Sequence, residues 1–372
     1  MTRLLIPGEP LPWFHGAALD GNPRYAFNTA AGRWMLLLMM GSGAQPASRN
    51  ALALIHAHRD LFDDENACFF GVTVDPEDVG EQRIAQQLPG IRWFLDYDGA
   101  ISTLLGARDQ TSGGEQVYRP HWILVDPLLR MHRIAAIEDG PALIELLRSM
   151  LRPARPETTA PVLIVPDIFS PELCRRLIDL HAGNGGEDSG FMREENGITV
   201  MRIDPDHKIR RDYTIEDQPL VNHLKARMNV ALRPMIQRAF QFDVTRVERF
   251  LIACYDAADG GHFRRHRDNT TKGTAHRRLA CTINLNAEDF DGGELRFPEF
   301  GSRSYRAPTG GALVFSCSLL HEAMPVTRGR RYAFLPFFYD EDAARLRERN
   351  MPFVAPEISG YRAEASGENE AV

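Results

Sequence analysis

A proline-rich stretch near the middle of the chain separates two parts that have different sequence patterns. Residues 152–161, Arg-Pro-Ala-Arg-Pro-Glu-Thr-Thr-Ala-Pro, contain three prolines and no large apolar side chain. Proline fixes φ and cannot donate a backbone hydrogen bond, so this composition favours an extended connection over a helix or a central strand. We therefore predict a linker at residues 152–160 between two domains, and a length of 372 residues fits two.

Before the linker, apolar strand-like runs alternate with helical segments. The predicted strands are 34–40, 68–75, 92–96, 121–126 and 130–136, and the predicted helices are 47–61, a polar helix that ends near residue 87, and 140–151. Such alternation is typical of a layered α/β sheet. Residues 1–151 are therefore predicted to form one α/β domain.

After the linker, short strands recur with Gly and Pro between them. The predicted strands are 251–255, 263–268, 279–285, 294–297, 312–316 and 332–339. This spacing predicts a double-stranded β-helix, or jelly roll, at residues 161–342. Helices are expected at 171–182 and 219–240, a mobile loop at 184–196, and a C-terminal segment at 343–372 with a frayed tail from about residue 357.

Three side chains in the second part form a candidate metal site. His266 and Asp268 stand two positions apart on a predicted strand, so they project to the same face. His321 follows another predicted strand, and a sheet that folds back would bring it beside them. Two histidines and one carboxylate are the ligand set of non-haem Fe(II) oxygenases, although zinc takes the same ligand types. His262 and His276 are expected to be polar surface residues outside this site.

The segments around these residues resemble the prolyl 4-hydroxylase group of Fe(II)/2-oxoglutarate oxygenases. The resemblance covers residues 161–340 and lies in 253–255, 260–269, 282–286, 292–295 and 321–332. It implies that the iron ligands are His266, Asp268 and His321. A carboxylate at position 268 also favours hydroxylation over halogenation, because halogenating relatives have a small residue there.

The same resemblance implies three further contacts, all to the co-substrate. Arg331 would pair with the distal carboxylate of 2-oxoglutarate, which a buried planar guanidinium can bind with two hydrogen bonds. Tyr255 and Asn284 match positions at which this group places polar contacts to the co-substrate. The expected cofactors are Fe(II), 2-oxoglutarate and O2, with ascorbate as an additional reductant.

The reaction implied is hydroxylation of a small-molecule or peptidyl substrate, with succinate and CO2 as co-products. A prolyl, amino-acid or metabolite target is equally compatible with the sequence. Two alternatives stay open: a catalytically inactive metal-binding or scaffold protein, and a redox protein that acts through its first domain.

The first domain resembles the thioredoxin-fold peroxiredoxin family in residues 71–75, 94–99 and 119–126. That family places its reactive cysteine in the loop after the first long strand, and here the loop 41–49 has none. Ser48 stands near the expected position, but a hydroxyl cannot form a thiolate. Cys68 is expected to be buried in a strand and Arg119 to form a surface ion pair. We predict a docking or substrate-shaping module without peroxidase activity.

Composition limits the remaining possibilities. The net charge of −7 predicts no general attraction to nucleic acid or anionic membranes. The five scattered cysteines suggest reduced buried thiols, and no apolar run approaches the length of a membrane span. A cytoplasmic location is expected, and the sequence predicts no oligomeric state.

Overall fold

The computed structural model describes residues 5–19, 21–110, 116–151 and 158–358. The chain divides into two compact units, Met1–Thr158 with Pro298–Gly301, and Thr159–Phe297 with Ser302–Val372. Most of the predicted linker, residues 111–115 and nearly all of the predicted tail lie outside the described residues.

The first unit is built on a five-stranded mixed sheet in the order β5-β4-β3-β8-β9. Its strands are β3 (Trp34–Gly41), β4 (Ala67–Thr73), β5 (Ile91–Leu95), β8 (His121–Val125) and β9 (Met131–Ala136). The first three are parallel, and β8 and β9 are antiparallel to their neighbours. Two-stranded pairs, β1 (His15–Gly16) with β2 (Tyr25–Ala26) and β6 (Arg108–Gln110) with β7 (Gln116–Tyr118), lie outside this sheet.

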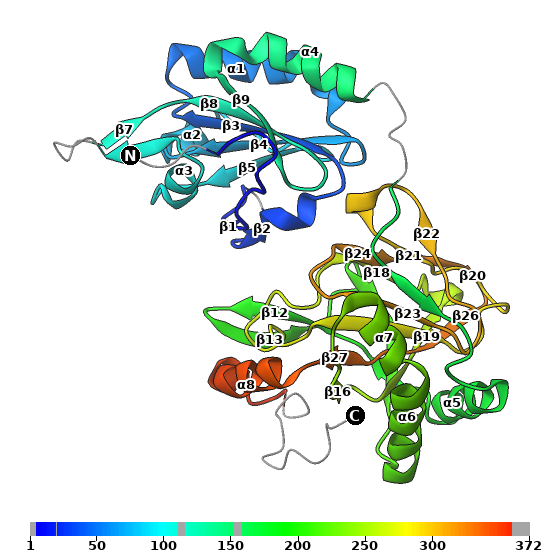
Figure 1. Ribbon diagram of the computed structural model, residues 1–372. Coiled ribbons are helices and arrows are strands. Elements are labelled where there is room, and N and C mark those ends of the chain that lie inside the picture. Colours follow the sequence, from blue (N-terminus) through cyan, green and yellow to red (C-terminus); the bar gives the residue numbers. More distant parts are fainter. Residues whose placement is uncertain (1–4, 20, 111–115, 152–157, 359–372) are drawn as a thin grey trace. The chain divides into compact units, whose positions relative to one another are not determined.

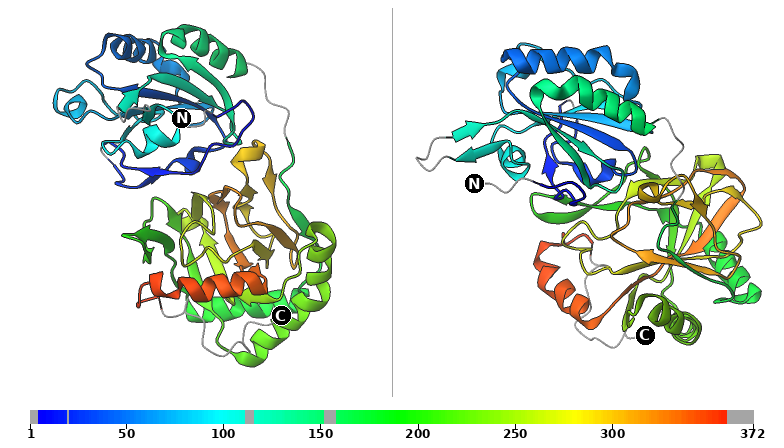
Figure 2. Two further views of the ribbon diagram at one scale, coloured as in Figure 1. Left: turned by 60° about the vertical axis from the view of Figure 1, so that its left-hand side comes forward. Right: turned by 45° about the horizontal axis from the view of Figure 1, so that its top comes forward.

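Two helices, α1 (Pro46–Ala57) and α4 (Gly140–Leu151), lie side by side on one face of this sheet (Figures 1 and 2). Their apolar side chains share a core with β3. Two short helices, α2 (Glu77–Gly80) and α3 (Ala100–Leu104), follow β4 and β5. The unit has the predicted thioredoxin-like α/β fold. The polar helix expected to reach residue 87 is wrong, because it ends at Gly80 and Gln82 then takes a left-handed φ of 55°.

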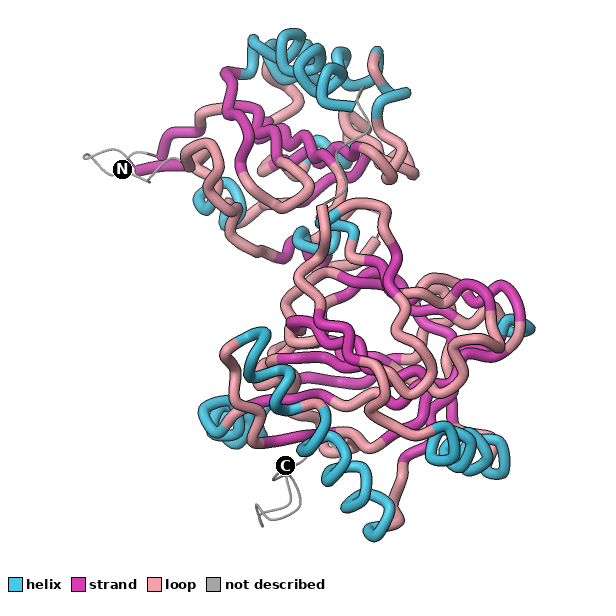
Figure 3. Tube along the Cα trace, turned by 45° about the vertical axis from the view of Figure 1, so that its right-hand side comes forward, coloured by secondary structure: helices cyan, strands magenta, loops and turns pink. Residues whose placement is uncertain are grey.

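The second unit is a jelly roll of two facing sheets, as predicted, and Figure 3 shows strands filling its interior with helices at its periphery. The larger sheet has the order β10-β23-β19-β26-β17-β15-β11, with β16 and β27 paired beside it, and the smaller sheet has the order β14-β18-β24-β21-β22. The strands of the larger sheet are β10 (Leu163–Val165), β11 (Glu187–Asp188), β15 (Arg211–Thr214), β16 (Arg246–Glu248), β17 (Leu251–Asp256), β19 (Leu279–Asn284), β23 (Ala312–Ser316), β26 (Arg330–Phe334) and β27 (Phe337–Tyr339). The strands of the smaller sheet are β14 (Lys208–Ile209), β18 (His262–His266), β21 (Leu295–Arg296), β22 (Ser304–Tyr305) and β24 (His321–Ala323).

The helices α5 (Pro171–Asn184), α6 (Gln218–Ala231) and α7 (Arg233–Phe240) contribute apolar side chains to the core on one face of the larger sheet. Ser170 caps α5 as its sequence suggests, since its hydroxyl accepts from the amide of Leu173. The single helix predicted at 219–240 is interrupted: Pro234 lies in the first turn of α7, where its missing amide proton is tolerated. A last helix, α8 (Glu341–Asn350), follows the roll.

The mobile loop predicted at 184–196 is also wrong. Phe191–Glu195 forms β12 and pairs antiparallel with β13 (Ile198–Arg202). The Gly-, Asn- and acid-rich composition of 184–196 did not indicate the first strand of this hairpin, and the apolar contacts of the hairpin are made with the distant residues Val354, Ala355 and Ile358. One further pair, β20 (Asp291–Gly292) with β25 (Val326–Arg328), completes the strands.

All five cysteines are buried free thiols, as expected. Among the described residues, no helix combines the length and the apolar character that crossing a lipid bilayer requires.

Candidate functional site

Strand register brings the two candidate histidine ligands together. His266 ends β18 and lies directly opposite His321, which begins β24. Asp268 stands just after β18, and its amide donates to the carbonyl of Cys317 at 3.0 Å. That bond folds the chain back after β18, so the carboxylate comes between the imidazoles.

The ligand atoms of these three residues all lie within 4.8 Å of one another. Asp268 Oδ1 is 3.6 Å from His266 Nε2, and its Oδ2 is 3.4 Å from His321 Nε2. Each imidazole is oriented through its other nitrogen, because Nδ1 of His266 is 2.7 Å from the carbonyl of Arg264 and Nδ1 of His321 is 3.0 Å from that of Leu319. A proton on Nδ1 leaves Nε2 as a lone-pair donor, which is the state that binds a metal.

The electrostatic environment favours the metal-binding protonation states. Burial, together with the neighbouring His321, lowers the pKa of His266 to about 4. Burial opposes ionisation of Asp268, but the two imidazoles and Arg277 hold the pKa of its carboxyl well below the usual range. Near neutral pH these groups are therefore an uncharged imidazole and a carboxylate.

Arg331 lies on β26 and points into the roll. It is 3% exposed, and it donates hydrogen bonds to uncharged acceptors: Thr282 Oγ1 at 3.0 Å and Asn284 Oδ1 at 3.4 Å. No carboxylate of the described residues forms an ion pair with it. Burial lowers the pKa of this guanidinium, and Arg210 and Arg306 add to that effect. A buried guanidinium of this kind is suited to an anionic ligand.

Tyr255 stands beside Arg331 on the neighbouring strand β17, with which β26 pairs. The ring centroid lies 5.2 Å from the Arg331 guanidinium carbon. Its hydroxyl accepts from Arg210 Nη1 at 3.3 Å, so the phenolic proton is free to donate to another oxygen. Asn284 donates to the carbonyl of Ala307 at 2.7 Å, which orients the oxygen that faces Arg331. The structure thus brings all the residues predicted for the co-substrate together.

Two contributions were missed at the level of sequence. Arg210 had no recognisable signal in the sequence, because it lies between two very short strands, β14 and β15.

The second missed residue is Glu248, which is buried and accepts from His276 Nε2 at 2.9 Å and from Arg277 Nε at 2.6 Å. The expectation that His276 is a surface residue is therefore wrong: it is 1% exposed. His262 is half-buried outside the metal cluster, with Nδ1 2.8 Å from the carbonyl of Gly260.

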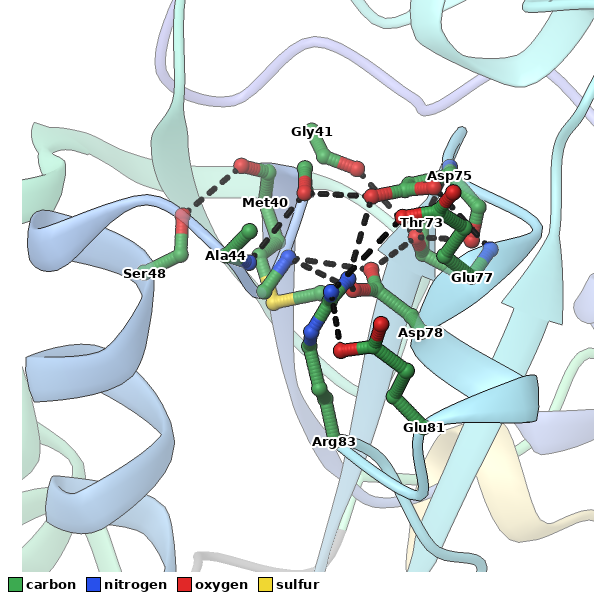
Figure 4. A network of polar contacts seen from close by, with 12 residues as sticks. Met40, Gly41, Ala44, Ser48, Thr73, Asp75, Glu77, Asp78, Glu81 and Arg83 are labelled. Atoms are coloured by element: carbon green, nitrogen blue, oxygen red, sulfur yellow. Dashed lines mark hydrogen bonds and ion pairs between the residues drawn. The ribbon is translucent and has the colours of Figure 1, made fainter.

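In the first unit, the loop that would carry a reactive cysteine is closed by a carboxylate network (Figure 4). Asp78 is fully buried and accepts from the amide of Gly43 at 3.0 Å, from Thr73 Oγ1 at 2.6 Å and from Arg83 Nη1 at 3.1 Å. Ser48 is also fully buried, and its hydroxyl donates to the carbonyl of Met40 at 3.0 Å. A hydroxyl in that position is unavailable as a nucleophile.

The other two expectations for the first unit agree with its structure. Burial raises the pKa of Cys68 to about 12, so this thiol stays protonated. Arg119, 60% exposed at its side chain, lies 3.6 Å from a carboxylate oxygen of Asp109.

Comparison with known proteins finds similarities to the second unit. Residues 250–339 match the model of the 2OG-Fe(II) oxygenase superfamily. A "PKHD-type hydroxylase" from Synechococcus sp. (strain JA-2-3B'a(2-13)) is 37% identical over 93 residues, 23% of this chain and 41% of that protein. Another, from Paracoccus denitrificans (strain Pd 1222), is 27% identical over 228 residues, 54% of this chain and 94% of that protein.

Among solved structures, a Xanthomonas campestris Peroxiredoxin Q aligns with a TM-score of 0.33 and 16% identity over 39% of this chain and 99% of that one. The chain spans about two fifths of the Synechococcus relative, 41% of its length. It carries a C-terminal 2OG-Fe(II) oxygenase domain, as the sequence predicted.

Proposed function

We propose that the second unit is an Fe(II)- and 2-oxoglutarate-dependent dioxygenase that hydroxylates a small-molecule or peptidyl substrate, with succinate and CO2 as co-products. The observation that carries the proposal is a buried cation, Arg331, without a carboxylate partner among the described residues, in the same domain as a cluster of two imidazoles and one carboxylate. The "PKHD-type hydroxylase" relatives support the same reaction class.

The residues present fit the cofactors that the family implies. Nε2 of His266, Nε2 of His321 and one oxygen of Asp268 would hold the metal, because their donor types suit Fe(II) and leave positions open. Zinc would accept the same donors, but a zinc site alone gives no reason for a guanidinium such as Arg331. Bound iron with 2-oxoglutarate and O2 supplies the oxidising power for C–H hydroxylation.

The protein side chains would bind and orient the co-substrate. Arg331 offers its planar fork to a distal carboxylate, and Thr282 and Asn284 fix the direction of that fork. The Tyr255 hydroxyl, which accepts from Arg210, can donate its own proton to the same carboxylate. Low exposure excludes water and strengthens each of these charge-assisted bonds. Ascorbate is proposed as an additional reductant.

Binding of Fe(II) and 2-oxoglutarate to the full chain tests the proposal, followed by succinate formation over a panel of amino acids, peptides and metabolites. Asp268→Ala should lose metal affinity. Arg331→Ala should weaken 2-oxoglutarate binding about tenfold or more and leave metal affinity nearly unchanged. Arg328→Ala is the matched control, because that side chain is 63% exposed and pairs with Asp291 on the surface. A folded wild-type chain that bound neither Fe(II) nor 2-oxoglutarate would instead be a scaffold protein.

A further inference from the structure

A second buried cation lies near the candidate metal ligands. Lys208 is 5% exposed, and its Nζ donates to Ser189 Oγ and to the carbonyl of Gly190, each at 2.6 Å. Both acceptors are uncharged, and no carboxylate of the described residues is within ion-pair distance of this ammonium. An ammonium has three N–H donors, so one remains for a further acceptor.

Strand register turns Lys208 toward the metal ligands. Lys208 on β14 pairs directly with Phe263 on β18, and directly paired residues project to the same face of a sheet. A register shift between Phe263 and His266 brings their rings together, with centroids 3.5 Å apart and planes 20° from parallel. The ammonium nitrogen lies 4.8 Å from the Phe263 centroid. Ammonium, phenyl ring and imidazole therefore stand in one stack beside the candidate metal position.

Burial and the neighbouring Arg210 lower the pKa of Lys208, and the carboxylates of Asp212 and Asp268 oppose that effect without forming an ion pair with it. Arg210 is bound by both carboxylate oxygens of Asp212, at 2.7 and 2.6 Å. Arg249 is also 3.7 Å from Asp212. Two carboxylates, Asp212 and Asp268, thus act on Lys208, and Asp212 is shared with two guanidinium groups, so cations outnumber carboxylates in this part of the interior.

The surfaces beside Lys208 suit a small organic molecule. The ring of His207 lies 4.4 Å from that of Phe191 and 5.5 Å from that of Phe263, measured between centroids. Burial lowers the pKa of His207 to about 4, so its ring is uncharged near neutral pH.

We propose that Lys208 is a specificity-determining residue that binds a carboxylate group of the substrate, whose apolar part lies against the neighbouring aromatic rings. The inference rests on the proposed function and defines its substrate class: a small or peptidyl molecule with a carboxylate near the carbon to be oxidised. A carboxylate fits better than a phosphate dianion, because the ammonium has one donor to spare and Ser189 already donates to Asp212.

Matched acid and amide probes test this assignment. The full chain is loaded with Mn(II) and 2-oxoglutarate, and calorimetry measures the binding of hydrocinnamate against hydrocinnamamide and of N-acetyl-L-proline against N-acetyl-L-prolinamide. Each amide keeps the shape of the acid and removes its charge. At least one acid should bind about tenfold more tightly than its amide, because a buried charge-assisted hydrogen bond is lost in the amide.

Variants then assign the preference to one side chain. Lys208→Met should abolish the acid preference without changing 2-oxoglutarate affinity, and Lys208→Arg should keep part of it. Lys225→Met is the control. Lys225 lies on α6, which packs on the larger sheet, whereas Lys208 lies on β14 of the smaller sheet. Melting temperatures establish whether each variant is folded. If Lys208→Met does not fold, the acid preference of Lys208→Arg is compared with that of the wild-type chain instead.

Results of two kinds would overturn the inference. The first is equal binding of acid and amide in both pairs by the wild-type chain, or a preference that survives in Lys208→Met. The second is a loss of 2-oxoglutarate affinity in Lys208→Met, which would assign the ammonium to the co-substrate. Failure of the proposed function has a different signature, since the wild-type chain would then bind neither Mn(II) nor 2-oxoglutarate. In that case the comparison of acid and amide binding, made on the chain without Mn(II) and 2-oxoglutarate, would still show whether Lys208 binds a carboxylate.

Discussion

The buried carboxylate of Glu248 ties three segments of the second unit together, and its removal should be strongly destabilising. Glu248 on β16 accepts from His276 and Arg277, both in the segment between β18 and β19, and lies 3.6 Å from Arg347 on α8. All four side chains are 6% exposed or less. Glu248→Gln keeps the size of the side chain but removes the charge that faces two buried guanidinium groups.

The size of the effect follows from that burial. Breaking a buried ion pair by neutralising one partner costs about 3–5 kcal/mol. Glutamine keeps one acceptor oxygen, so we expect the lower end, about 3 kcal/mol. In a unit of this size that corresponds to a fall in melting temperature of about 6–12 °C. Because Arg277 also lies 3.5 Å from the carbonyl of Asp268, metal affinity should fall as well.

Calorimetry of the full chain measures this, with Glu341→Gln as the control. Glu341 binds Arg246 at 2.9 Å but is 50% exposed, so its loss should cost less than about 1 kcal/mol. The pKa of Glu248 is held well below its usual value, since Arg277, His276 and Arg347 outweigh the effect of burial. Its stabilisation is therefore complete above the unfolded pKa, about 4.3, and is lost as pH falls toward the folded pKa. Equal melting temperatures for the two variants at pH 7 would refute the reasoning.

Three further predictions concern the first unit. Asp78→Asn should lower its free energy of unfolding by about 1–3 kcal/mol in denaturant titration, because it weakens the buried network that closes the loop. Peroxide consumption by the full chain with a thiol reductant should be no faster than without protein, and Cys68→Ser should not change it. Gly71→Ala should abolish cooperative unfolding of this unit by calorimetry or shift it to far lower temperature, because the added Cβ would lie 2.1 Å from the Trp93 ring. Gly80→Ala, with nothing within 4 Å of its Cβ, should be nearly neutral.

The candidate metal ligands could be predicted because the local pattern and the chemistry agree. His266 and Asp268 are close in sequence, and the apolar run at 312–316 predicted a strand just before His321. The resemblance likewise predicted a buried guanidinium at Arg331, and this side chain is buried beside Tyr255. Short-range periodicity predicted the strands, because a strand must present one face to the core.

The elements that were missed depend on contacts between distant segments. Strand β12 lies in a segment rich in Gly, Asn and acidic residues, and the hairpin that it forms with β13 gains its apolar contacts from residues near Val354. Lys208 and Arg210 lie on strands of two and four residues or between them, too short for a periodic signal. Glu248 looked like any charged residue, because its partners His276, Arg277 and Arg347 are far away along the chain. Tertiary pairing, which no local pattern encodes, decides the burial of such groups.

The two buried cations explain why overall charge was a poor guide to ligands. The net charge of −7 is a sum over the whole chain and does not show where each charge lies, whereas Arg331 and Lys208 are 3% and 5% exposed and donate hydrogen bonds only to uncharged acceptors in the described structure. Burying a cation without an anion costs stability, so each is best understood as half of a pair that a ligand completes. Ligand anions that bind only the folded state must then stabilise it by mass action. Raising 2-oxoglutarate from zero to a hundredfold excess over its dissociation constant should therefore stabilise the second unit by about 2.7 kcal/mol, and Arg331→Ala should reduce that gain to about 1.4 kcal/mol or less at the same concentration.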